Sequence, residues 1–142
     1  MSDAPGILEG GCHCGAVRYR VQGNAAYTVF CHCTDCRRTS GAPMVAWVGF
    51  PGKDITILSG EPARYASSDV AERRFCSHCG TPLFYKHHKS EIVDITIASL
   101  DDPETSRPEF HVFTRSRLSW IRLNDGLTRY PGWKHEGNPE AP

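Results

Sequence analysis

The chain has 142 residues, which is enough to bury the core of one ordinary domain but too few for two. Hydrophobic residues make up 39% of the sequence and charged residues 23%, a normal globular composition that argues against wholesale disorder. Sixteen basic residues balance sixteen acidic residues, and this neutrality argues against a dedicated nucleic-acid-binding protein, whose affinity would come from many phosphate contacts.

The N-terminal residues 1–6 contain neither the basic start nor the apolar stretch of a signal peptide. No apolar run approaches the ~20 residues that a membrane-spanning helix needs. We therefore expect a cytoplasmic protein that contacts no membrane and no nucleic acid. A single domain is expected over residues 1–136, followed by a frayed tail over residues 137–142, which are rich in Gly and Pro.

Most of the chain predicts short strands separated by turn residues. Val17, Tyr19 and Val21 alternate with two arginines, which is the period-two pattern of a half-buried strand. Further strands are expected where apolar runs are bounded by Gly, Pro or Ser, over residues 44–50, 55–58, 83–85, 92–97 and 110–113. The only helix expected is one or two turns over residues 33–40, so the predicted fold class is all-β.

Seven cysteines fall in three tight groups, namely Cys12 and Cys14, then Cys31, Cys33 and Cys36, then Cys76 and Cys79. An odd count without an export signal does not fit a secreted disulfide scaffold, and a Cys-x-Cys pair is too close for a comfortable disulfide. Clustered thiols in a reducing compartment instead indicate a metal site. Thiolates suit zinc or an iron–sulfur centre, and the absence of ferredoxin-type spacing favours zinc.

The cysteine groups can be combined in two ways. One joins the Cys33–Cys36 pair to the Cys76–Cys79 pair as a ribbon-like site, although the 39 residues between them exceed the usual ~15–20. The other joins the Cys12–Cys14 pair to the Cys76–Cys79 pair, and leaves the group over residues 31–36 as a separate cluster. Gly15 and Gly80 follow these two pairs and allow tight turns around a metal, which favours the second combination.

The cysteine motifs and two later motifs resemble the glutathione-dependent formaldehyde-activating enzyme family, also called the GFA/CENP-V family. The resemblance covers residues 10–133, nearly the whole chain. The matching motifs are Gly10–Gly15, Cys31–Arg37, Phe75–Phe84, His111–Trp120 and Asp125–Leu127.

The resemblance implies a β-tent fold of small antiparallel sheets that zinc ties together. It also implies two zinc sites with different tasks. A structural zinc is expected on Cys12, Cys14, Cys76 and Cys79, and an active-site zinc on the catalytic cysteines Cys31, Cys33 and Cys36.

The activity implied by the resemblance is that of a carbon–sulfur lyase, which forms and splits the adduct of a thiol, glutathione, with a small aldehyde. Ligand count points the same way, because zinc with three protein ligands keeps one position for an incoming thiol, which it would deprotonate. Such a site is expected to hold its metal less tightly. Two alternatives stay open: a second structural zinc closed by His32 or Asp35, and a non-enzymatic zinc-stabilised binding module or thiol carrier.

Other polar residues are secondary candidates. His13, His32 and His78 lie inside the cysteine groups, where they would either orient ligands and shuttle protons or simply occupy solvated turns. Arg115 and Arg117 alternate as on a strand, and they would either receive the carboxylates of glutathione or face solvent at a strand edge.

Overall fold

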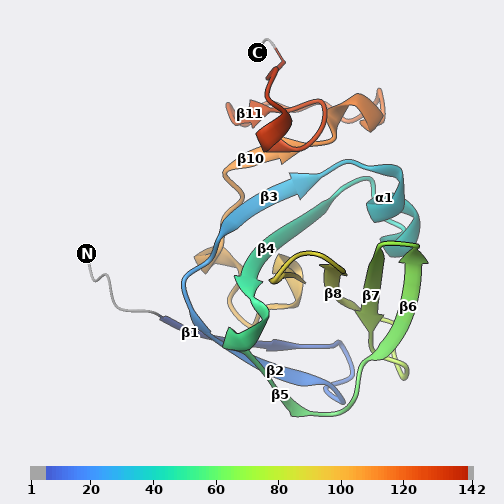
Figure 1. The fold of residues 1–142 in the computed structure, drawn as a ribbon, viewed down its shortest axis with the longest axis vertical. Coiled ribbons are helices and arrows are strands. Elements are labelled where there is room, and N and C mark those ends of the chain that lie inside the picture. The colour runs from blue at the N-terminus through green and yellow to red at the C-terminus, as the bar shows by residue number, and fades with distance from the viewer. Residues whose placement is uncertain (1–5, 141–142) are drawn as a thin grey trace.

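The computed structural model describes residues 6–140 of the chain, which form two β-sheets and one short α-helix (Figure 1). β2 (Arg18–Gly23) is the middle strand of the smaller sheet. Its apolar side chains alternate with polar ones, so one face of the strand is buried and the other is not. Tyr19 and Val21 are 0% and 1% exposed and face the core. β1 (Gly6–Gly11) and β5 (Ile55–Ser59) pair antiparallel with β2 on either side.

The larger sheet has eight strands in the order β11-β10-β3-β4-β9-β8-β7-β6. Its neighbouring strands are antiparallel, except that β10 runs parallel to both β3 and β11. Its strands are β3 (Tyr27–Cys31), β4 (Val45–Pro51), β6 (Ala63–Ser68), β7 (Ala71–Phe75), β8 (Pro82–His87), β9 (Ile92–Thr96), β10 (Phe110–Val112) and β11 (Thr128–Arg129).

The α-helix and five single-turn 3-10 helices fill the connections. α1 (Thr34–Ser40) begins after Cys33 and ends at Gly41, whose φ of 70° is the left-handed conformation that glycine adopts most easily. None of the helices within residues 6–140 is long and apolar enough to cross a membrane. The 3-10 helices are η1 (Gly52–Asp54), η2 (Ile97–Ser99), η3 (Pro103–Thr105), η4 (Thr114–Ser116) and η5 (Lys134–Glu136).

The main core lies between the two sheets. Figure 1 shows the larger sheet bending from β3 and β4 round to β6, while β1, β2 and β5 close the lower side of the view. Val48 and Leu83 from the larger sheet are 0% exposed, and they belong to one cluster with Tyr19 and Val21 of the smaller sheet. Tyr19 also makes an edge contact with the ring of Phe84, at 5.3 Å between centroids. Burial of these side chains therefore holds the sheets together.

The prediction of a mostly β fold with one short helix is confirmed. β2, β4, β5, β8, β9 and β10 lie within one or two residues of the predicted strands. β6 and β7 were not expected, because the sequence over residues 63–75 is mainly polar and lacks apolar alternation. The larger sheet also differs from the small, purely antiparallel sheets that were expected, because β10 pairs parallel with β3. Parallel strands need a long crossover connection, and β10 lies far enough from β3 along the chain to allow one.

Two expectations concern the C-terminal third. Arg115 and Arg117 do not alternate on a strand, because Phe113 has a φ of 56° and turns the chain into η4. Within the predicted tail, the backbone N–H of Glu140 donates to the carbonyl of Arg129 at 2.7 Å, while residues 141–142 lie outside the described residues, as do residues 1–5. The single domain over residues 1–136 and the frayed tail over 137–142 stay predictions.

A pair of leucine variants tests the position of the core. Leu83 is 0% exposed, whereas Leu58 on β5 is 41% exposed. Leu83→Ala is expected to lower the free energy of unfolding by about 2–5 kcal/mol, because it leaves a cavity that the sheets cannot close. Leu58→Ala is expected to change it by less than about 0.5 kcal/mol. Urea denaturation of the metal-loaded chain measures both values, and equal losses would contradict this core.

Candidate metal centres

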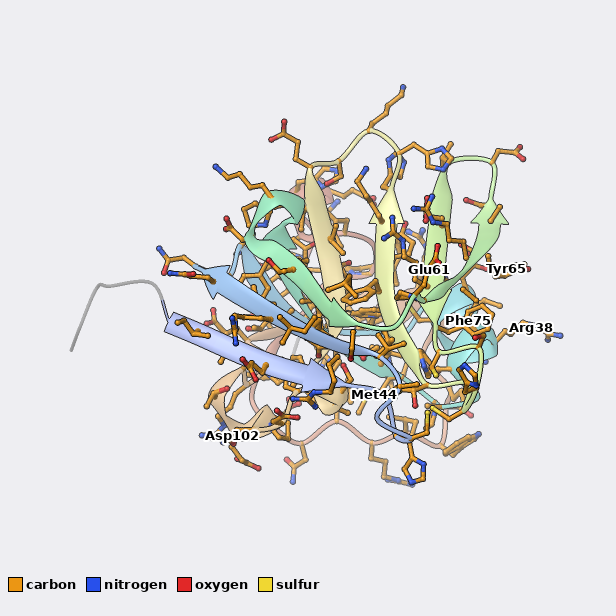
Figure 2. All side chains as sticks on the ribbon, turned by 90° about the horizontal axis from the view of Figure 1, so that it is seen from below. Arg38, Met44, Glu61, Tyr65, Phe75 and Asp102 are labelled. Carbon is orange, nitrogen blue, oxygen red and sulfur yellow. The ribbon has the colours of Figure 1, made fainter. Side chains whose placement is uncertain are left out.

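Four cysteines from two distant loops form one cluster. Cys12 and Cys14 follow β1, and Cys76 and Cys79 lie between β7 and β8, directly after Phe75 (Figure 2). Their four Sγ atoms lie within 4.8 Å of one another. This is the second of the two combinations that the sequence allowed, and the ribbon-like combination is wrong.

The two loops of the four-cysteine cluster have matching backbone geometry. Gly15 and Gly80 have φ values of 82° and 81°, and each donates its N–H to the carbonyl of a cysteine three or four residues earlier, Cys12 at 3.1 Å and Cys76 at 2.8 Å. The N–H of Val17 in addition points at the Cys12 Sγ atom, at 3.2 Å. The glycines are needed because a side chain is strained at positive φ.

The spacing of these sulfur atoms fits a tetrahedral metal ion. The Sγ atoms of Cys12 and Cys14 lie 3.6 Å apart, and those of Cys14 and Cys76 lie 3.8 Å apart. Zinc–sulfur bonds of about 2.3 Å at the tetrahedral angle place two thiolates about 3.8 Å apart. Four thiols at this spacing are able to complete the coordination of a metal ion without any other ligand.

The other three cysteines form a second cluster, the three-cysteine cluster, where β3 ends and α1 begins. Cys31 and Cys36 are 6% and 5% exposed, and their Sγ atoms lie 3.2 Å apart. Cys33 is half-buried, and its Sγ atom accepts the N–H of Cys36 at 3.3 Å. Hydrogen bonds from the Cys31 and Cys36 thiols, with the nearby guanidinium of Arg73, hold the pKa of the Cys33 thiol well below its usual range.

Neither alternative fourth ligand completes this cluster. Its group of converging ligand atoms contains three thiols and includes neither His32 nor Asp35. The Nε2 atom of His32 instead contacts Nδ1 of His111 at 2.9 Å. The cluster therefore offers three protein ligands, one fewer than the four that close a structural zinc site and that the four-cysteine cluster supplies.

Arg73 on β7 places a buried positive charge beside the three-cysteine cluster. Its side chain is 9% exposed, and Nη2 lies 3.9 Å from the Cys36 Sγ atom. The guanidinium carbon lies 4.8 Å from the centroid of the Tyr85 ring and 6.0 Å from that of Trp47. No carboxylate within residues 6–140 forms an ion pair with Arg73. Because an uncompensated buried charge is costly, the thiolates are the natural counter-charge.

A cavity of about 600 Å³ opens from the three-cysteine cluster. All three cysteines line it, and so does Arg73. Its wall combines aromatic rings, from Tyr27, Trp47, Tyr85, Phe113 and Trp133, with several polar and charged side chains. A cavity of this size, with both apolar and polar lining, suits a small organic ligand next to the cluster.

Two buried histidines and the exposed Asp125 form a chain of side chains that anchors the loop between Cys31 and Cys33. His32 and His111 are both 0% exposed, and Nε2 of His111 lies 2.7 Å from a carboxylate oxygen of Asp125. Burial lowers the pKa of His32 to about 4, so its ring is neutral at neutral pH. Nε2–H of His111 donates to Asp125, and Nδ1 of the same ring contacts Nε2 of His32, so the three side chains form one continuous hydrogen-bonded chain.

The remaining histidine and arginine candidates do not line this cavity. His13 and His78 are exposed in the turns of the four-cysteine cluster. Arg115 is exposed and lies over the Phe113 ring, while Arg117 donates a hydrogen bond to the carbonyl of Ile121.

Arg73 and Asp94, which both line the cavity, were not among the residues that the sequence singled out. Nothing local distinguishes Arg73 from its neighbour Arg74. Asp94, by contrast, interrupts the apolar run of β9, and a carboxylate inside such a run is a signal that could have been noticed.

Residues 7–116 match the sequence model of the family described as glutathione-dependent formaldehyde-activating enzyme. A Halomonas elongata protein provisionally given the same enzyme name is 29% identical over 127 residues, which are 82% of this chain and 81% of that protein.

Two further relatives are more distant or shorter in overlap. A Schizosaccharomyces pombe protein named as an uncharacterised lyase is 33% identical over 79 residues, and the match spans 57% of its length and 56% of this chain. The crystal structure of a Rhodobacter sphaeroides protein is similar in fold, with a TM-score of 0.53 and 22% identity over 86% of this chain and 98% of that one.

Two cysteine variants test the division into two clusters. The wild-type chain is expected to carry two metal ions, as measured by native mass spectrometry. Cys33→Ala is expected to keep one ion and a cooperative unfolding transition, because the four-cysteine cluster is intact. Cys76→Ala removes a ligand that connects the loops after β1 and β7, so it is expected to lose that ion and unfold at markedly lower urea. Loss of both ions in Cys33→Ala would contradict this division.

Neighbouring arginines on β7 provide a matched test of the buried charge. Arg73→Gln is expected to weaken metal binding at the three-cysteine cluster by roughly 10-fold or more, the usual effect of removing a group that supports metal ligands. Arg74→Gln is the control, because Arg74 bonds Glu72 at 3.0 Å and does not approach the cluster. Competition with a chelator measures both affinities, and an equal effect of the two changes would refute the role given to Arg73.

Proposed function

The chain belongs to the glutathione-dependent formaldehyde-activating enzyme family, and on this premise we propose that it is a zinc-dependent carbon–sulfur lyase. Its substrate would be the adduct of glutathione with a small aldehyde, which it would form and split. The names of two relatives, an enzyme of this kind and a lyase, support the reaction class. The mostly β fold and the two cysteine clusters support the zinc sites.

The observation that carries this proposal is the contrast between the two clusters. The four-cysteine cluster supplies a full tetrahedral set of thiols, and we assign it a structural zinc. The three-cysteine cluster supplies one ligand fewer and opens into a cavity that aromatic and polar side chains line together. We assign it the active-site zinc, on Cys31, Cys33 and Cys36.

Zinc on three thiolates would leave one position at which a substrate thiol binds as thiolate. The residues of the chain would support the chemistry around that position. The guanidinium of Arg73 would offset the negative charge that accumulates on sulfur, and the rings of Trp47 and Tyr85 hold that guanidinium beside the cluster. In the forward direction the thiolate sulfur bonds to the carbonyl carbon and the carbonyl oxygen takes a proton; the reverse direction breaks the same bond.

The test measures exchange between formaldehyde and S-hydroxymethylglutathione by nuclear magnetic resonance, with and without zinc-loaded chain. The exchange is expected to run clearly faster than the spontaneous reaction, and Cys33→Ala is expected to abolish the acceleration while keeping the structural metal. S-methylglutathione is the matched control ligand, because it lacks the thiol and is expected not to inhibit.

Each other outcome contradicts part of the proposal. Tight binding of glutathione without any acceleration would identify a thiol carrier rather than a lyase. Acceleration that survives in Cys33→Ala would place the chemistry outside the three-cysteine cluster.

A further inference from the structure

One row of side chains crosses five strands of the larger sheet beside the cavity. Residues directly opposite each other on neighbouring strands point to the same face, and the register pairs Tyr27, Gly49, Asp94, Tyr85 and Arg73 in succession. Except for the glycine, all of them line the cavity that holds the three-cysteine cluster. The row therefore places one carboxylate, that of Asp94, among aromatic rings in this cavity.

Gly49 is what brings Tyr27 and Asp94 together. A Cβ atom at Gly49 would lie 2.6 Å from Cζ and 2.8 Å from Cε1 of Tyr27, so any side chain there would collide with the ring. Without a side chain at this position, the ring of Tyr27 lies across β4, and its hydroxyl donates a hydrogen bond to Oδ1 of Asp94 on β9. Residues on β3, β4 and β9 thus together hold this carboxylate in place.

The other oxygen of Asp94 has no partner. Within residues 6–140, Oδ2 of Asp94 accepts no hydrogen bond and forms no ion pair. Burial raises the pKa of Asp94 to about 6, although the hydroxyl of Tyr27 and the charge of Arg73 act in the opposite direction. Asp94 is half-buried, and at neutral pH it is mostly a carboxylate whose second oxygen is able to accept from a cation that binds beside it in the cavity.

Aromatic residues line the cavity near this carboxylate. Tyr27 and Trp133 make an edge contact at 5.2 Å between ring centroids, and Tyr85, the cross-strand neighbour of Asp94, already holds the Arg73 guanidinium over its ring. A carboxylate close to aromatic rings suits an organic ammonium group, because both the charge and the rings attract a cation.

The distance from the cysteines suits a substrate of peptide size. Nη2 of Arg73 lies 3.9 Å from the Cys36 Sγ atom, and Arg73 and Asp94 are two strands apart in the row, which corresponds to about 10 Å. An extended tripeptide also spans about 10 Å, so a thiol of this size held at the cysteines could place its far end near the carboxylate.

We propose that Asp94, together with the rings of Tyr27, Tyr85 and Trp133, binds the ammonium group of the thiol substrate. This inference rests on the proposed function, because it takes the thiol to be held at the three-cysteine cluster. It defines the substrate class as a peptide-sized thiol that carries a free amino group at the end far from sulfur. Asp94 is then a specificity-determining residue and takes no part in breaking the carbon–sulfur bond.

The test is a cycle of two ligands and two proteins. Calorimetric titration of the zinc-loaded chain compares glutathione with N-acetylglutathione, which keeps the thiol but lacks the ammonium charge. Wild type is expected to bind glutathione at least about tenfold more tightly, as for a hydrogen bond to a charged group. Asp94→Asn is expected to remove this preference by weakening glutathione alone.

Asp102→Asn is the control variant. Asp102 is exposed and lies in Figure 2 at the opposite side of the molecule from Arg38 and Tyr65, and it does not line the cavity. The preference of this variant for glutathione is expected to equal that of wild type. The ligand comparison on wild type alone also tests the inference, so the conclusion does not depend on the folding of Asp94→Asn.

The remaining outcomes separate the two proposals. A wild-type chain that does not distinguish the two ligands overturns the ammonium site, as does an equal loss of both ligands in Asp94→Asn. A preference that depends on Asp94 without any acceleration of adduct exchange overturns the lyase and leaves the ammonium site standing. If wild type and Asp94→Asn both accelerate adduct exchange with equal KM for glutathione, the ammonium site is overturned and the lyase stands.

Discussion

The four-cysteine cluster is the constraint on which the arrangement of the two sheets depends. Cys12 continues from β1 of the smaller sheet, and Cys76 continues from β7 of the larger sheet, so the cluster connects segments that are far apart in the chain. Structural zinc sites contribute an apparent ~10–16 kcal/mol at neutral pH, which is comparable to the whole stability of a typical domain. A metal ion at this position would therefore be a principal source of stability, in addition to the apolar core between the sheets.

This connection also determines where the cavity forms. The turn between β7 and β8 carries Cys76 and Cys79 of the four-cysteine cluster, and the register of this hairpin with β9, and of β9 with β4, sets the row from Tyr27 to Arg73. A shift of one residue in any of these strands would turn its side chains to the opposite face of the sheet. The guanidinium of Arg73 and the carboxylate of Asp94 would then no longer face the cavity of the three-cysteine cluster. The four-cysteine cluster and the three-cysteine cluster are thus coupled through strand register rather than through direct contact.

The sequence predicted the features that depend on local pattern. The alternation around Tyr19 predicted β2, and the glycines next to the cysteine pairs favoured the correct grouping of the thiols. The hairpin of β6 and β7 was missed because its stability comes from pairing and from the adjacent cluster, and its side chains are largely polar. Arg73 and Asp94 could not be placed in the same site, because their proximity depends on the register of β7, β8 and β9.

The buried histidines explain how three thiols converge without a fourth protein ligand. Cys31 and Cys33 lie on either side of His32, whose ring is joined through His111 to Asp125, and the backbone N–H of His32 donates to the carbonyl of Val112 at 3.1 Å. These bonds tie the loop to β10 and to the segment that follows it. In a closed site the fourth ligand restrains the others, whereas here hydrogen bonds outside the thiols supply part of that restraint. The parallel pairing of β10 with β3, which the sequence did not predict, is what brings His111 into reach. The open coordination position proposed for the site therefore depends on this feature of the larger sheet.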